Sequence, residues 1–166
     1  MTSHKPARGS ASFEVTRAAA ADVAAIAPLF DAYRQFYQRP ANLAGAYQFL
    51  ADRIANKESV IFFCHPPDDR TKPVGFMQLY PIFSSLSMAR SWVLNDLFVV
   101  PESRSHGIAR LLLSTADEHA RNSGAIGIAL ETNHDNMAAQ RLYDSFGYEV
   151  ADETKHYWRS IAPNSR

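Results

Sequence analysis

The sequence predicts an α/β protein in which helices cover a single mixed β-sheet. Three observations predict this fold class. Apolar residues alternate or run together in segments of strand length, they recur every three or four residues in longer segments, and the segments follow the order β, two helices, several strands, then β-α-β-α-β-β. With 166 residues, 46% hydrophobic and 20% charged, the chain is expected to form one domain over residues 13–166.

The first third of the chain is expected to contain one strand and two helices. Residues 1–12 are interpreted as a flexible leader because they carry no apolar pattern that a core would bury. Residues 13–17 alternate in polarity like a strand. Residues 22–37 keep helical spacing but include Pro28, which predicts a kink or a break. A second helix is expected over residues 43–56.

The middle of the chain is expected to supply most strands of the sheet. Residues 59–64 and 74–79 are apolar runs on either side of a polar turn. Residues 80–87 are expected to form a loop rich in aromatic and hydroxyl groups. Residues 92–100 are mostly apolar, as in a strand that is buried on both faces.

The last part of the chain is expected to alternate between helices and strands. Gly124 and Gly147 stand where two amphipathic helices are expected to end. In order, the expected elements are a helix over residues 108–123, a strand over 126–131, a helix over 136–146, and short strands near 148–150 and 156–160.

Two polar residues interrupt the apolar strand over residues 92–100. Asn95 and Asp96 stand next to each other between apolar neighbours. Because an unpaired buried carboxylate is costly, this pair predicts a β-bulge or a functional site. Two roles stay open for Asp96. It acts either as a base or substrate anchor, or as the partner of a structural hydrogen bond at the bulge.

The segment that joins this strand to the next helix has the pattern of a phosphate-binding loop. Arg104, Gly107 and Ala109 form the pattern Arg-x-x-Gly-x-Ala at the start of an amphipathic helix. The first backbone N–H groups of a helix have no partner within it, and together with the positive end of the helix dipole they favour an anion, above all a phosphate. An ordinary helix start with a glycine kept for steric reasons gives the same pattern, so both interpretations stay open.

A second pattern, Asn136-x-x-Ala139-x-x-x-Tyr143-x-x-x-Gly147, covers the following helix. Asn136 is a natural N-cap, and Tyr143 lies about two turns into the helix. Tyr143 either supplies a functional hydroxyl or packs its ring in the core as part of an ordinary amphipathic helix.

Charge, cysteine content and hydropathy exclude several classes of protein. Seventeen Lys and Arg residues balance seventeen Asp and Glu residues, so no dedicated nucleic-acid-binding surface is expected. The one cysteine, Cys64, is expected to pack in the core. No segment reaches transmembrane length and no signal-peptide pattern is present, so neither a membrane nor a secreted location is expected and the cytoplasm is the predicted compartment. The histidines His106, His119 and His134 lack the spacing of a metal site.

Both patterns, in this order and spacing, resemble motifs of the GNAT superfamily of N-acetyltransferases, and the resemblance covers residues 13–160. Residues 104–109 are similar to the family's pyrophosphate loop, and residues 136–147 to its Asn-x-x-Ala-x-x-x-Tyr-x-x-x-Gly segment. Residues 80–87 and 94–99 also look like the branch with yeast-type histone and D-amino-acid acetyltransferases. The resemblance implies acetyl-CoA as co-substrate and a central mixed, mostly antiparallel sheet flanked by about four helices.

The resemblance also implies a role for each residue of the two motifs. Backbone groups of residues 97–99 would pair with the amides of pantetheine, and the amides of residues 105–110 would hold the pyrophosphate. Arg104 would contact phosphate directly, and Asn136 would bond the pantetheine arm. Tyr143 would protonate the departing thiolate. The implied acetyl-CoA contacts are Leu97, Phe98, Val99, Arg104, Ser105, His106, Gly107, Ile108, Ala109, Arg110, Asn136, Ala139 and Tyr143.

Acetyl transfer also needs a base, because an alkyl ammonium with a pKa of about 10.4 must lose a proton before it attacks. Asp96 and Glu131 are the candidates, and either would act through a chain of water molecules. The similar polyamine acetyltransferases have Leu-Glu-Asp-Phe-Phe-Val where this chain has residues 94–99. Their glutamate aligns with Asn95, which cannot act as a base, so the base stays open between the two carboxylates.

Several aromatic residues are candidates for the acceptor site. Trp92 together with Tyr33, Phe36 and Tyr37 would form the wall of a pocket between the first helices and the central strand. Packing in the core is the alternative for at least half of these residues.

The sequence therefore predicts an acetyl-CoA-dependent N-acetyltransferase whose acceptor is a primary amine of a small molecule, such as an amino acid or a polyamine. The amine would attack the thioester directly, without a covalent enzyme intermediate or a metal. A protein lysine is the second acceptor class, although the neutral charge indicates no docking surface for basic tails. A non-catalytic acetyl-CoA-binding module is the third interpretation, and it would not require the hydroxyl of Tyr143. A homodimer is expected from the resemblance.

Overall fold

The structure is a computed structural model that describes residues 12–151, 155 and 157–161. It divides into two compact units at Glu131, and each unit is described by itself. The leader expected over residues 1–12 lies, except for Ser12, outside the described residues.

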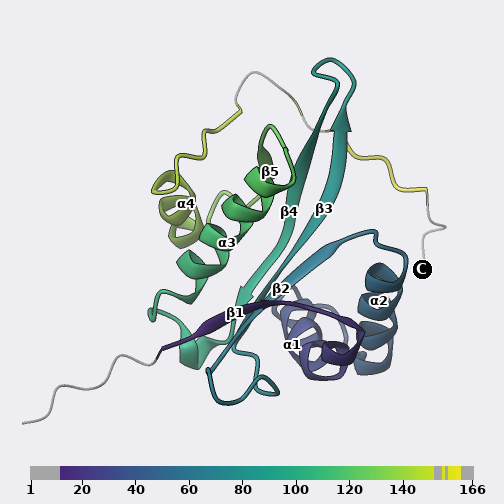
Figure 1. The fold of residues 1–166 in the computed structure, drawn as a ribbon, viewed down its shortest axis with the longest axis vertical. Coiled ribbons are helices and arrows are strands. Elements are labelled where there is room, and N and C mark those ends of the chain that lie inside the picture. Colours follow the sequence, from purple (N-terminus) through teal and green to yellow (C-terminus); the bar gives the residue numbers. More distant parts are fainter. Residues whose placement is uncertain (1–11, 152–154, 156, 162–166) are drawn as a thin grey trace, which may run out of the picture. The chain divides into compact units, whose positions relative to one another are not determined.

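The first unit is built on a sheet in which the described residues form five strands, in the order β1-β2-β3-β4-β5 (Figure 1). The strands are β1 (Glu14–Arg17), β2 (Val60–His65), β3 (Gly75–Ser84), β4 (Ala89–Val99) and β5 (Ile128–Leu130). Neighbouring strands are antiparallel except β4 and β5, which are parallel. The predicted mixed, mostly antiparallel sheet is confirmed.

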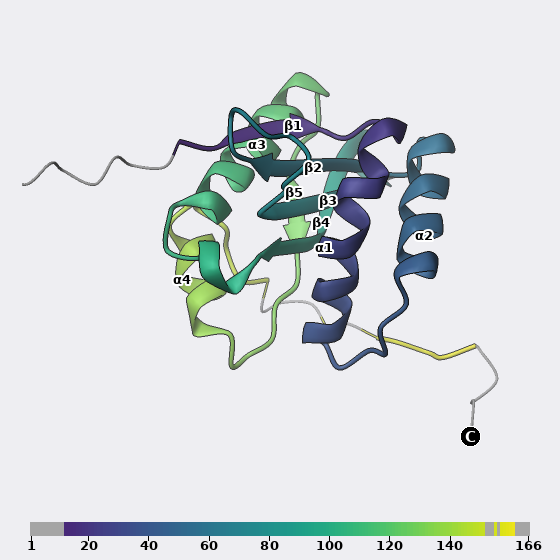
Figure 2. The same cartoon turned by 90° about the horizontal axis from the view of Figure 1, so that it is seen from below.

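Helices cover both faces of this sheet. Figure 2 shows α1 (Val23–Phe36) and α2 (Leu43–Ala55) on one face and α3 (Ile108–Asn122) on the other. The core under α1 and α2 contains buried apolar side chains from both helices and from three strands, among them Val23, Ile26, Leu29, Phe30, Leu50, Ile61, Phe63, Phe76 and Phe98. Burying one such side chain contributes about 1.5–3 kcal/mol, so this layer holds α1 firmly on β3 and β4.

Helix α1 continues without a break through Pro28, where the sequence predicts a kink or a break. A proline removes the N–H that would bond the carbonyl four residues earlier, here that of Ala24. Both Ala24 and Pro28 are exposed, so water can take the place of the missing bond. The neighbouring Ile26 and Leu29 are buried and keep the helix on the sheet.

Strand β3 is longer than the sequence predicts. The expectation of a loop over residues 80–87 is wrong for residues 80–84, which belong to this strand. Residues 80–84 pair with residues 89–93 of β4, and a turn over residues 85–88 joins the two strands. Phe83 is 70% exposed, so this end of the hairpin lies outside the core. Backbone hydrogen bonds between the two strands hold this end of the hairpin together. It therefore does not need the apolar pattern of a buried strand.

In the second unit, helix α4 (Met137–Asp144) confirms the helix expected over residues 136–146. Gly147, with φ of 82°, follows its last turn as expected. The chain reverses there at a backbone conformation that only glycine adopts without strain.

The two strands expected near the end of the chain are not formed by the described residues. Residues 148–150 and 157–160 have no strand assignment, and His156 lies outside the described residues. Val150, Tyr157 and Trp158 are 79%, 84% and 84% exposed. A strand needs a neighbouring strand and a packed face, and these side chains have no such packing.

Candidate active site

Strands β4 and β5 part near the middle of β4. Their parallel pairing runs from Trp92 and Ile128 to Leu94 and Leu130, and it ends there. Beyond Leu94, the described residues place no strand against this edge of β4. An open strand edge offers backbone N–H and C=O groups that can pair with an extended ligand.

The point of divergence coincides with a β-bulge. Gln78 of β3 pairs with Asp96, and the next residue, Leu79, pairs with Leu94, so Asn95 is an extra residue in β4. The bulge predicted from the two polar residues is therefore present. A bulge increases the local twist and redirects the side chains that follow it.

The bulge places Asp96 in a buried position under α1. Asp96 is 6% exposed, and its Oδ1 accepts a hydrogen bond from Asn95 Nδ2 at 3.2 Å. The side chain of Tyr33, on α1, also hydrogen-bonds this carboxyl group. Burial raises the pKa of Asp96 above its usual value, and the bonds with Tyr33 and Asn95 only partly oppose that rise. A carboxylate with a raised pKa is better suited to accept a proton near neutral pH.

Two residues of β3 extend this polar cluster. Gln78 is fully buried, and its Nε2 donates to Ser59 Oγ at 2.7 Å. Within the described residues, Gln78 Oε1 has no hydrogen-bond partner. Burial and the charge of Asp96 raise the pKa of Tyr80 to about 12, so this hydroxyl stays protonated.

Sequence reasoning missed Tyr80 because it was expected in a loop. The signal that was available is the alternation of Phe76, Gln78 and Tyr80, which have the two-residue spacing of one strand face.

The second candidate base, Glu131, lies near the same point of the sheet. It follows Leu130, the last residue of β5 that pairs with β4, and Asp96 lies two residues beyond the partner of Leu130. Both carboxylates are therefore placed where the two strands part. Although the two carboxylates lie near the same point of the sheet, Glu131 is exposed to solvent and Asp96 is buried.

The loop after β4 presents its backbone at the start of α3. Gly107 is the N-cap residue, has φ of 78°, and receives no capping bond from a side chain. The first helical bond runs from Leu111 N–H to the Gly107 carbonyl at 3.0 Å, so the amides of residues 108–110 precede it. A Cβ atom at Gly107 would meet nothing within 4 Å. The positive end of α3 therefore borders open space that can hold an anion.

Two side chains hold the shape of this loop. The Nε of Arg104 donates to the Val99 carbonyl at 3.1 Å, and its guanidinium lies over the rings of Phe36 and Phe98 at 5.8 and 6.0 Å. His106 Nδ1 lies 2.8 Å from the Arg104 carbonyl oxygen, to which it donates when protonated. Arg104 thus contacts β4 and α1, whereas the sequence predicts a contact with phosphate.

The second motif forms the start of α4, in the second unit. Asn136 Oδ1 accepts the Ala139 N–H at 3.2 Å, which confirms the expected N-cap. Tyr143 is buried, and its ring packs edge-on against Tyr148 with 5.8 Å between centroids. The helix therefore holds the Tyr143 ring in a fixed orientation within this unit.

Trp92 does not join the aromatic residues of α1, so that expectation is wrong. Its Nε1 donates to Ser123 Oγ at 2.9 Å, on the α3 side of the sheet. Tyr33 and Phe36 pack instead near Phe98, on the α1 side. Trp92 and Phe98 would share a face in a regular strand, but the extra residue in the bulge reverses the alternation between them.

Two classes of feature are absent from the described part of the chain. No cluster of three or more His, Cys, Asp or Glu side chains is arranged to hold a metal ion there. Nor does any described helix have the length and apolar character needed to cross a membrane.

Comparison with known proteins identifies the family. Residues 26–148 match the family described as "Acetyltransferase (GNAT) family". The chain belongs to the GNAT acetyltransferase family. An "Uncharacterized N-acetyltransferase" of Bacillus subtilis (strain 168) is 46% identical over 147 residues, which are 89% of this chain and 97% of that protein. A "Probable acetyltransferase" of Haemophilus influenzae is 33% identical over 118 residues, which are 70% and 80% of the two chains.

A solved structure has the same fold. The crystal structure of a "probable acetyltransferase" matches with a TM-score of 0.85 and 37% identity, over 90% of this chain and 99% of that chain. The GNAT fold and the acetyltransferase activity predicted from the two motifs are therefore confirmed. GNAT enzymes use acetyl-CoA as co-substrate, so the donor is known at the level of the family.

Proposed function

We propose that this GNAT enzyme transfers the acetyl group of acetyl-CoA to a primary amine of a small molecule such as an amino acid or a polyamine. The observation that carries the proposal is the continuity of two binding elements. The open edge of β4 beyond Leu94 leads directly into the loop at Gly107. The two elements suit an amide-containing arm followed by a pyrophosphate, which are successive parts of coenzyme A.

In this proposal the donor is held mainly by backbone groups. In an antiparallel pair, alternate residues direct their backbone groups to opposite edges of the strand. The Val100 N–H donates to the carbonyl of Val74, the residue before β3, at 3.0 Å, so Leu97 and Val99 direct their backbone groups to the open edge. Leu97 is then the main partner of the pantetheine amides, since the Val99 carbonyl accepts a bond from Arg104. The amides of residues 105–110 hold the pyrophosphate.

The remaining residues carry out the proton transfers. The acceptor ammonium gives one proton to Asp96 or Glu131 through water, and the neutral amine attacks the thioester carbonyl carbon. As the C–N bond forms and the C–S bond breaks, Tyr143 protonates the departing thiolate. The amine nitrogen then loses its second proton as the amide forms, and this proton restores the hydroxyl of Tyr143 through solvent. An unperturbed tyrosine with a pKa near 10 is a suitable acid for a thiolate.

The neutral charge of the chain supports a small acceptor. With seventeen basic and seventeen acidic residues, the protein has no excess of negative charge that would attract a lysine-rich tail over long range. Protein lysine acetylation is the alternative, and acceptor competition distinguishes the two. The homodimer stays a prediction, which a measured mass of twice the monomer would support.

The substitution Tyr143→Phe tests the assignment of an enzyme against that of a binding module. Turnover should fall by roughly 10²- to 10⁴-fold, the usual effect of losing a general acid, while calorimetric acetyl-CoA binding is retained. The matched control is Tyr148→Phe, which removes the hydroxyl of the neighbouring ring and should keep full turnover. Full turnover in Tyr143→Phe would contradict the acid role. Wild-type protein that binds acetyl-CoA but releases no thiol with any amine would contradict the enzyme.

A further inference from the structure

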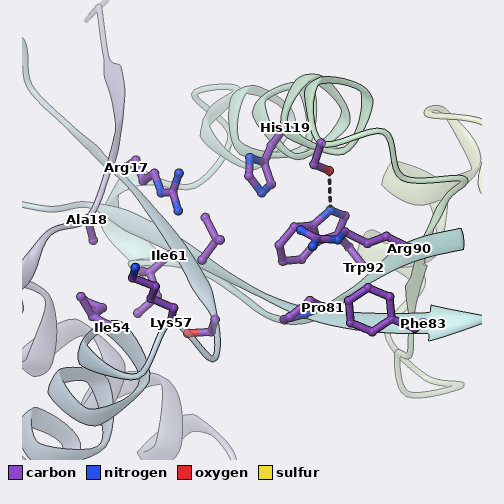
Figure 3. Close-up of a pocket in the computed structure, with 13 residues that line it drawn as sticks. Arg17, Ala18, Ile54, Lys57, Ile61, Pro81, Phe83, Arg90, Trp92 and His119 are labelled. Carbon is purple, nitrogen blue, oxygen red and sulfur yellow. Dashed lines mark hydrogen bonds between the residues drawn. The ribbon is translucent and has the colours of Figure 1, made fainter.

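A cavity lies within the first unit, at the end of β4 far from Gly107. Its volume is about 560 Å³, and Figure 3 shows side chains from strands and helices around it. Arg17 of β1, Lys57 after α2, Arg90 of β4 and His119 of α3 are among the residues that line it.

This cavity is separate from the loop that we assign to acetyl-CoA. Arg90 and Val99 stand near opposite ends of β4, and nine residues of strand span roughly 30 Å at about 3.3 Å per residue. Along α3, His119 comes eleven residues after Ile108, a distance of roughly 16 Å at about 1.5 Å per residue. A ligand in the cavity therefore lies a long way from the phosphate-binding amides.

The cavity is lined by positive charge that no carboxylate neutralises among the described residues. Arg17, Lys57 and Arg90 form no salt bridge within the described residues, although several other cations of the chain do. None of the lining residues is acidic. Glu58 is adjacent to Lys57 in the chain, but it pairs with Arg53. Like charges around one cavity repel each other, and a bound anion would relieve that repulsion.

His119 adds an unused polar atom to this lining. Its ring packs between Phe62 and Trp92, with centroids 5.4 and 4.8 Å away. The Nε2 atom is buried and has no hydrogen-bond partner among the described residues. Burial and the nearby charges of Arg17 and Arg90 lower the pKa of His119, so the ring is neutral near pH 7. A buried nitrogen without a partner is unfavourable, and a neutral imidazole that carries its proton on Nε2 can donate it to an anion.

Two aromatic side chains line the cavity, and of these Phe83 is 70% exposed whereas Trp92 is 3% exposed. The Arg90 guanidinium lies over the rings of Phe83 and Trp92, at 5.3 and 5.7 Å. The hydrogen bond from Trp92 Nε1 to Ser123 Oγ fixes the indole in place, as the dashed line in Figure 3 shows. The exposed Phe83 ring beside these cations suits a ligand that has a planar apolar body and an anionic group.

We propose that this cavity is a binding site for a small organic anion. Arg17, Lys57 and Arg90 hold its carboxylate or phosphate, and His119 donates a further hydrogen bond. The planar body of the ligand packs on Phe83, whose side chain is 70% exposed. The site lies apart from the loop assigned to acetyl-CoA, so it binds its ligand in the absence of acetyl-CoA.

Calorimetric titration of the full chain, without acetyl-CoA, tests the site with three probes. Benzoate and phenyl phosphate combine a planar body with the two kinds of anionic group, and benzamide is the neutral counterpart of benzoate. At least one anion should bind saturably, and at least tenfold more tightly than benzamide. Comparing benzoate with phenyl phosphate tells whether a carboxylate or a phosphate fits better.

Variants locate the binding. Arg90→Gln and Lys57→Gln change exposed side chains and should each weaken the preferred anion at least tenfold. The matched control is Arg121→Gln, which removes the same charge from α3 outside the cavity and should leave the affinity unchanged. The proposal is overturned if neither anion binds saturably, if benzamide binds as well, or if Arg121→Gln weakens binding as much as Arg90→Gln. Displacement of the probe by saturating acetyl-CoA would also overturn it, because the probe would then occupy the cofactor loop.

Discussion

Among single residues, Asp96 combines the most unusual environment with the most direct link to the chemistry. It lies directly after a bulge, is almost fully buried, and receives hydrogen bonds from Asn95 and Tyr33. Burial raises its pKa, which brings the carboxylate closer to the range in which a base works at neutral pH.

The substitution Asp96→Asn should remove the acidic limb of the pH–rate profile. A base acts only when ionised, so wild-type activity should fall as the pH drops through the raised pKa of Asp96. The variant should be less active than the wild type at neutral pH, and its remaining activity should not fall as the pH drops through this range. Steady-state rates between pH 5 and 9 measure this. A limb that is unchanged in Asp96→Asn would identify Glu131 as the base.

The stability of the same variant separates catalysis from a structural role. The pKa of Asp96 is raised in the folded chain, so its contribution to stability is fully present below the unfolded value near 3.8 and is lost as the pH rises through the folded pKa. Above the folded pKa, the buried charge therefore costs stability. We expect Asp96→Asn to melt at the wild-type temperature or above it, as judged by thermal unfolding. A large fall would instead support the structural hydrogen bond at the bulge.

Individual site residues could be predicted where they belong to a local pattern. Gly107 and Asn136 occupy helix starts, and their backbone roles follow from a few neighbouring residues. The contact between Tyr33 and Asp96 could not be predicted in this way, because it joins α1 to β4 across the core. Tyr80 was missed for the same reason, since its surroundings depend on the pairing of β3 with β4.

At the scale of elements, the start of α3 depends on a glycine backbone. Gly107 and Gly124 stand at the two ends of α3 with φ of 78° and 68°, and neither has an atom within 4 Å of an added Cβ. Asparagine adopts positive φ more readily than other residues with a Cβ atom. The two glycines therefore allow a matched test of close ligand approach.

Gly107→Asn should weaken acetyl-CoA binding at least tenfold, or about 1.4 kcal/mol, because its side chain would occupy the space above the amides. Gly124→Asn makes the same change at the far end of the helix and should leave the affinity unchanged. Calorimetry on both variants gives the comparison, and thermal unfolding confirms that each is folded. Equal acetyl-CoA affinities in the two variants would contradict the assignment of the phosphate loop.

The junction between β3 and α3 depends on the absence of a side chain at Gly75. A Cβ at Gly75 would lie 3.0 Å from the Phe98 carbonyl oxygen and 3.1 Å from Ile108 Cγ2, which is tighter than ordinary contact. Gly75→Ala should destabilise the protein by about 1–3 kcal/mol and lower the melting temperature by roughly 2–12 °C. Gly127→Ala, where the added atom meets nothing within 4 Å, is the control. Equal melting temperatures for the two variants would show that the junction relaxes.

Most elements could be predicted because hydrophobic periodicity reports which face is buried. The misses occur where another effect decides. The exposed end of β3 has no buried face to mark it, and α1 tolerates Pro28 because the affected carbonyl is exposed. The face on which Trp92 lies depends on the bulge, which reverses the alternation of β4. Asn95 and Asp96 predicted the bulge itself. Its effect on the orientation of Trp92 could not be predicted, because that depends on the pairing register of β3 and β4.

At the scale of the whole molecule, two short motifs were sufficient to predict the family, because they also fix the order of strand, loop and helix around them. The family match over residues 26–148 confirms it. Composition could not predict the cavity lined by Arg17, Lys57, Arg90 and His119, because a balanced total charge conceals a local excess of cations. Only the fold brings these residues together.

Thiol release from acetyl-CoA, measured with a panel of acceptors, tests the central claim most directly. The panel contains amino acids of both enantiomers, polyamines, aminoglycosides and a lysine-rich peptide. We expect thiol release with at least one class of small amine, at a kcat/KM above that of the peptide. Release with the peptide alone would contradict a small-molecule acceptor, and acetyl-CoA binding without release for any acceptor would contradict the proposed enzyme.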